Sequence, residues 1–73
     1  MGAREIQDLL ASEPFSAFVI HTTEFGDVTV ARPEQVTVYD KGLEIAQGEA
    51  GDVENRLLVA YGKIISITVH PPG

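Results

Sequence analysis

Residues 15–47, FSAFVIHTTEFGDVTVARPEQVTVYDKGLEIAQ, decide the fold, because turn-forming residues divide them into short apolar segments. Turns are predicted at Gly26-Asp27, Arg32-Pro33 and Asp40-Lys41-Gly42. Glycine permits the positive φ of a tight hairpin, and proline cannot donate a hydrogen bond to a sheet ladder. Segments of this length and spacing are typical of small antiparallel β-structures.

We expect strands over residues 15–23, 27–31, 35–39 and 43–47. The first of these is apolar on both faces, whereas the others alternate more clearly. Phe18 and Ile20 are predicted to lie in the densest part of the core. The residues predicted to surround them are Val28, Val30, Val36, Val38, Ile45 and Ile67.

The C-terminal part of the chain predicts a polar, glycine-rich loop over residues 48–55, followed by extended structure over 56–60 and 64–69. Tyr61-Gly62-Lys63 interrupts this extended region only briefly. Strict alternation along the closing strand places Ile65, Ile67 and Val69 on one face and Ile64 on the other. We expect this strand to pair antiparallel with the first one.

The N-terminal segment from Ala3 to Ser12 has helical spacing, with Ile6, Leu9 and Leu10 on one face. Pro14 ends the helix, because the residue before a proline is disfavoured in α geometry. A helix this short is marginal alone, so its apolar face must pack on the rest of the protein.

The predicted fold is therefore mainly β: a helix at about residues 3–12, then a small five-stranded antiparallel barrel at about residues 15–69. The 73 residues form one domain, 1–73. The chain contains no cysteine, and a core of this size supplies only about 3–5 kcal/mol. Self-association is an expected source of further stability.

Charge disfavours several classes of partner. Eleven acidic residues against five basic ones give a net charge of −6, and the cations are scattered singly. Nucleic acids and anionic membranes require clustered cations, so neither is an expected partner. No apolar stretch approaches the roughly 20 residues of a membrane span, and no signal region opens the sequence. We expect a cytoplasmic protein.

The residue types that carry catalysis or bind metals do not form a recognisable pattern. Pairing of the first and last strands would separate His21 from His70 by roughly 20 Å, which is too far to share a metal ion. Glu49, Asp52 and Glu54 lack the alternation of a calcium loop. No nucleophile elbow or phosphate-binding glycine pattern is present. We predict no cofactor, no metal and no enzymatic activity.

The chain resembles a group of short, uncharacterised bacterial proteins that have a brief helix followed by Pro-Phe-x-x-Phe-x-Ile. Here that motif is Pro14 to Ile20, and a glycine turn at Gly26, a proline break at Pro33 and Ile-x-x-Ile at Ile64 to Ile67 follow it. Such proteins often carry histidine before the proline, where this chain has Arg32. The order of elements also resembles the Sm-like small barrel, whose members form rings through strand edges and often bind RNA. The RNA-binding Asp-x-x-x-Asn of that family is absent, because Asp40 is followed by Lys41, Gly42, Leu43 and Glu44.

The functional hypothesis is a non-enzymatic interaction or assembly module that binds itself or another protein through an open strand edge. Its predicted interface is an outer apolar surface made of Val19, Leu57, Leu58 and Ile64, with either Leu57 or Leu58 facing the core instead. The alternatives are an Sm-like nucleic-acid-binding protein and a small-ligand binder.

Overall fold

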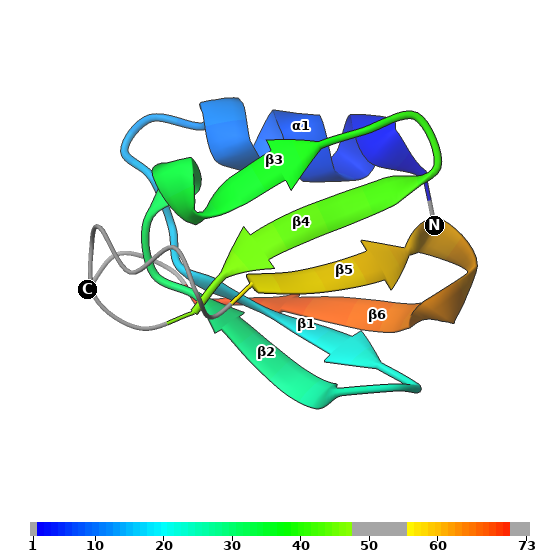
Figure 1. Cartoon of the computed structure of the whole chain (residues 1–73). Helices are drawn as coiled ribbons and strands as arrows, with labels where there is room; N and C mark the ends of the chain where they lie inside the picture. Colours follow the sequence, from blue (N-terminus) through cyan, green and yellow to red (C-terminus); the bar gives the residue numbers. More distant parts are fainter. Residues whose placement is uncertain (1, 48–55, 71–73) are drawn as a thin grey trace.

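The computed structural model describes residues 2–47 and 56–70. Helix α1 (Ala3–Ala11) precedes six strands, so the fold is mainly β, as predicted. The strands are β1 (Phe18–Thr22), β2 (Gly26–Val30), β3 (Val36–Val38), β4 (Gly42–Ala46), β5 (Arg56–Ala60) and β6 (Ile64–Val69). They form two antiparallel three-stranded sheets, β2-β1-β6 and β3-β4-β5 (Figure 1).

A closed five-stranded barrel, which we predicted, is not found in the described part of the chain. Two short 3₁₀ turns, η1 (Pro33–Gln35) and η2 (Tyr61–Lys63), interrupt the extended chain. Each turn carries the chain from one sheet to the other, so the strands on either side of it belong to separate ladders. The predicted loop 48–55, with Glu49, Asp52 and Glu54, and the predicted tail 71–73 lie outside the described residues.

Strand β1 is the centre of the first sheet and pairs with both β2 and β6. The hairpin to β2 turns at Gly26, whose φ of 69° is the positive value that we expected of this glycine. The predicted pairing of the first and last strands is confirmed, with Phe18 opposite Val69 and Ile20 opposite Ile67. The backbone N–H of His70 extends this ladder by donating to the carbonyl of Ala17 at 2.8 Å.

A β-bulge interrupts the β1–β6 ladder at Ile65. Ser66 lies opposite His21 and Ile64 lies opposite Thr22, so Ile65 has no counterpart on β1. An extra residue reverses the alternation of side chains beyond it. Ile64 therefore lies on the same face as Ile67, and Ile65 points to solvent with 65% of its surface exposed.

The corner between β2 and β3 is held by a buried glutamine. Pro33 supplies the fixed φ that starts η1, and the Oε1 of Gln35 accepts hydrogen bonds from the backbone N–H groups of Ala31 and Arg32 at 2.8 and 2.9 Å. Its Nε2 donates to the carbonyl of Ala46 at 2.9 Å. A buried amide is stable only when such groups are paired, and here the pairing ties the corner to β4.

The core lies between the two sheets, and α1 packs against it. Its fully or nearly fully buried apolar residues are Ile6, Phe18, Ile20, Val28, Val30, Val36, Leu43, Ile45, Val59 and Ile64. The predicted core residues Val38 and Ile67 pack against this cluster and are partly buried, as are Leu9 and Leu10 of α1. The hydroxyl and backbone N–H of Ser12 both donate to the carbonyl of Leu9, which marks the end of the helix. Within the described residues, no helix combines the length and the apolar character that crossing a membrane requires.

Candidate functional site

The predicted interface residues do not form one surface. Leu57 lies opposite Ile45 in the β4–β5 ladder and faces the core, whereas Leu58 lies opposite Glu44 and faces outward. Leu58 is 67% exposed, the largest value among the exposed large apolar residues of the described chain. The choice between Leu57 and Leu58 is thus settled by the register: Leu58 is the surface residue.

Ile64 was predicted to lie on the outer surface, and this prediction is wrong. The side chain is buried, with only 7% of its surface exposed, and it belongs to the core cluster. The bulge at Ile65 is the reason. Strict alternation would place Ile64 on the outward face, but the extra residue in β6 shifts the alternation so that Ile64 faces the core. Its neighbour Ile65 takes the outward position instead.

Val19 faces outward from β1 but does not join an apolar patch. It lies directly opposite Thr29 of β2 on one side and Thr68 of β6 on the other. These polar neighbours leave Val19 half-buried among threonines. The sheet that carries Val19 is also not the sheet that carries Leu58.

The four strands at the sheet edges differ in the side chains that they expose. The exposed residues of β2 include Asp27 and Thr29, and β3 is only three residues long. Charged side chains and short length both discourage pairing with another chain. In contrast, β5 exposes Leu58, and β6 exposes Ile65 and Val69. Among the described residues, β5 pairs only with β4, and β6 pairs only with β1.

Two open grooves accompany these two edges. One, of about 380 Å³, lies between α1 and β6 and is lined by Glu5, Asp8, Leu9, Ile67 and Val69. The other, of about 400 Å³, lies where the end of β5 meets the start of β4 and the turn between β3 and β4, and the exposed side chains of Tyr39 and Leu58 contribute to its wall. The two strands that expose large apolar side chains at a free edge, β5 and β6, therefore each line one of these grooves.

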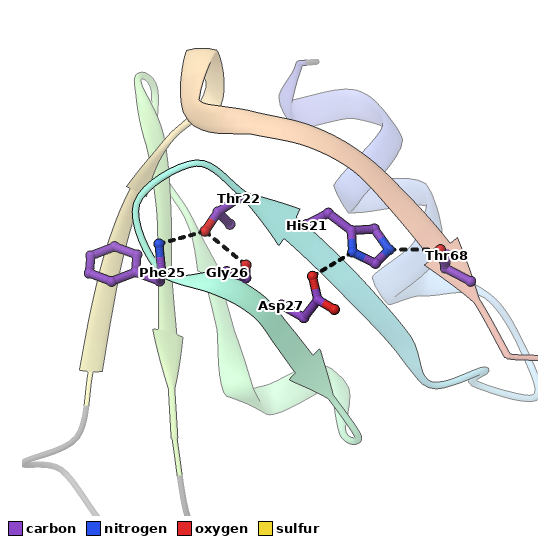
Figure 2. Close-up of polar contacts among 6 residues, drawn as sticks. All are labelled: His21, Thr22, Phe25, Gly26, Asp27 and Thr68. Atoms are coloured by element: carbon purple, nitrogen blue, oxygen red, sulfur yellow. Dashed lines mark hydrogen bonds and ion pairs between the residues drawn. The ribbon is translucent and has the colours of Figure 1, made fainter.

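A polar cluster on the outer face of the first sheet joins all three of its strands (Figure 2). The Nδ1 of His21 on β1 lies 2.7 Å from the Oδ1 of Asp27 on β2. Its Nε2 lies 2.8 Å from the hydroxyl oxygen of Thr68 on β6. Beside it, the hydroxyl of Thr22 donates to the carbonyl of Gly26 and accepts from the N–H of Phe25, which fixes the hairpin.

The carboxylate–imidazole–hydroxyl order in this cluster is also the order found in nucleophilic catalysis. Here it occupies the outer face of a sheet, and neither groove described above is lined by its residues. We interpret it as a cross-strand contact that fixes the order and register of β2, β1 and β6. The sequence analysis missed it, although the Gly26 hairpin alone places Asp27 opposite His21.

Metal-binding residue types are dispersed over the described chain. His21 is the fourth of the five residues of β1, whereas His70 follows the C-terminal end of β6. Residues 2–47 and 56–70 hold no group of three or more His, Asp or Glu side chains placed to bind one ion. Comparison with known proteins adds no assignment, because no family model, curated protein or solved structure matches the chain.

Proposed function

We propose that this protein is a non-enzymatic assembly module that associates with further copies of itself through the edges of β5 and β6. One observation carries the proposal. Leu58 on β5 and Ile65 on β6, the two most exposed large apolar side chains in the described chain, lie on strands that each have one unpaired edge.

An unpaired strand edge is a template for another strand, since its outward N–H and C=O groups have no ladder partner. The two edges are similar in length, with five residues in β5 and, beyond the bulge at Ile65, the four regular residues Ser66 to Val69 in β6. Pairing of β5 from one copy with β6 from the next uses a different surface on each copy. Such a head-to-tail contact leaves one free edge at each end, and repetition produces a ring if the rotation closes.

The same arrangement supports a finer description of the fold. We propose that the two sheets are halves of an Sm-like or Src-homology-like small barrel that stays open between β5 and β6. In that description η1 is a bend within one long strand made of β2 and β3, so the six observed segments would make five strands. In the proposed assembly, one neighbouring copy would cover the free edge of β5 and another would cover the free edge of β6.

The proposed partner is protein rather than nucleic acid or membrane, and the proposed compartment is the cytoplasm. The net charge of −6 supports the choice of a protein partner, because it would repel phosphate backbones and anionic lipids. Exposed apolar side chains beside open edges supply contacts that do not need a favourable charge.

Sedimentation velocity over a wide range of concentration tests the proposal. We expect the wild-type protein to form dimers or larger species at micromolar concentration. Leu58→Glu should remain folded and sediment as a monomer, because a charge on the outer face of β5 cannot be desolvated at an interface. Thr29→Glu is the matched control, since it adds the same charge to the exposed face of edge strand β2.

The control variant should assemble like the wild type. A wild-type protein that stays monomeric throughout the range would overturn the proposed function. Assembly of Leu58→Glu at the wild-type concentration would show that β5 is not the contact strand.

A further inference from the structure

The groove between α1 and β6 combines an apolar floor with an acidic wall. Leu9, Ile67 and Val69 supply the floor, and Glu5 and Asp8 lie on the helix beside it. Val69 is 43% exposed, so the floor is accessible. Glu5 already accepts a hydrogen bond from the backbone N–H of Gly2 at 3.2 Å, and the Asp8 side chain is exposed to solvent. A ligand complementary to this groove has an apolar group and a cation side by side.

The chain itself presents that combination on β5. Arg56 and Leu58 are two residues apart on a strand, so their side chains lie on the same face at a separation of about 7 Å. Leu58 is 67% exposed, and the Arg56 side chain is 47% exposed. Of the other large apolar side chains exposed outside β6, Phe25 follows Glu24, and Tyr39 is followed by Asp40 and Lys41. Glu5 and Asp8 would repel Glu24 of the first segment, whereas the second segment lies in the turn between β3 and β4 rather than on a strand with a free edge.

We propose that the groove between α1 and β6 of one copy receives the Arg56 and Leu58 side chains of β5 from the next copy. This inference rests on the proposed function and specifies its contact. Leu58 packs on Leu9, Ile67 and Val69, while Arg56 lies against Asp8 and Glu5.

Edge pairing and filling of the groove are compatible in one contact. A strand added to the free edge of β6 directs alternate side chains toward the face that carries Ile67 and Val69. Those alternate side chains are the ones that enter the groove. Arg56 donates to Glu44 Oε1 of its own chain at 2.7 Å. A guanidinium has five N–H donors, so Arg56 retains donors for a second carboxylate across the interface.

Charge reversal on helix α1 tests the filling of the groove separately from the pairing of the strand edges. We expect Asp8→Lys to weaken self-association by about tenfold or more, because a lysine would then face Arg56 of the neighbouring copy. Glu13→Lys reverses an exposed charge outside the groove and should have no effect. The double variant Asp8→Lys/Arg56→Glu restores opposite charges and should recover most of the affinity.

A mixing experiment tests whether the contact is head-to-tail. Asp8→Lys keeps an intact β5 and Leu58→Glu keeps an intact groove, so an equimolar mixture should form a one-to-one pair at concentrations where each alone is monomeric. A wild-type protein that assembles while Asp8→Lys matches it in affinity would overturn this inference and leave edge pairing intact. A mixture that stays monomeric would contradict the head-to-tail contact. A monomeric wild type would instead reject the proposed function itself.

Discussion

Gly42 of β4 pairs with Ala60 and lies close to the backbone of β5. A Cβ built at this position would come within 2.5 Å of the carbonyl oxygen of Val59, and backbone atoms cannot move aside as a flexible side chain can. We expect Gly42→Ala to lower the free energy of unfolding by about 1–3 kcal/mol through overpacking. Urea denaturation monitored by tyrosine fluorescence measures the loss.

Gly62 provides the matched control, since a Cβ there would meet no atom within 4 Å. Gly62→Ala should be neutral or stabilising by up to about 1 kcal/mol, because it restricts the unfolded chain. Equal losses in the two variants would contradict the close approach at Gly42.

The Tyr61 hydroxyl makes the free energy of unfolding depend on pH in the alkaline range. Its hydroxyl donates to the carbonyl of Tyr39 at 2.6 Å, and desolvation together with the carboxylate of Asp40 raises its pKa above the ordinary value of about 10. The unfolded chain therefore loses this proton at a lower pH than the folded protein does. The contribution of Tyr61 is complete below about pH 10 and is lost as the pH rises through the folded pKa.

Comparison with Tyr61→Phe isolates the contribution of the Tyr61 hydroxyl to the pH dependence of stability. We expect the difference in unfolding free energy between the two proteins to be constant near neutral pH and to shrink above pH 10. A difference in unfolding free energy that stays constant up to pH 11 would show that folding does not change the pKa of the Tyr61 hydroxyl.

Strand β6 is the element that the sequence predicted least well. The first and last residues of β6 were predicted correctly, because turn residues flank its apolar run. Its antiparallel pairing with β1 was also predicted correctly. The faces were assigned wrongly at Ile64, since a bulge without glycine has no signature of its own in the residues around it. The adjacent isoleucines at 64 and 65 were the only visible sign, because a regular half-buried strand seldom has two large apolar residues in succession.

Deletion of Ile65 tests the bulge. Without it, Ser66 remains opposite His21 and Ile64 remains opposite Thr22, so the ladder becomes regular and no core side chain changes face. We expect a folded protein with a cooperative thermal transition. Deletion of Thr29 is the control: β2 is regular at that point, so one of Val28 and Val30 would be turned out of the core. That variant should not fold, and equal tolerance of both deletions would contradict the register.

At the scale of the whole molecule, the predicted core was largely correct because helical and strand periodicities each identify one inward face. Phe18, Ile20, Val28 and Val30 are all buried as expected. What the sequence could not supply was the relation between elements that are distant in the chain. The groove between α1 and β6, and the contact from His21 to Thr68, each join residues far apart in sequence and follow from packing rather than local pattern.

The buried apolar residues of the described chain form one cluster, and no disulfide reinforces it, so one large truncation should abolish folding. Phe18 is fully buried and packs against the ring of Phe15, with the ring centroids 5.9 Å apart. We expect Phe18→Ala to cost about 3–5 kcal/mol, which is comparable to the total stability of a domain this small. Circular dichroism in the near and far ultraviolet should show an unfolded or molten protein. A sharp thermal transition would contradict this estimate.

The bulge also has a consequence for how many copies an assembly can contain. A partner strand can slide by two residues along a regular edge and still keep its hydrogen bonds and facing side chains. Ile65 removes that freedom, because the residues on its two sides do not share one alternation. Only Ser66 to Val69 remain as an uninterrupted edge, the segment that also lines the groove. In the proposed assembly, one permitted alignment would fix one rotation between neighbours, so a ring that closes would have a defined number of subunits rather than a mixture of sizes.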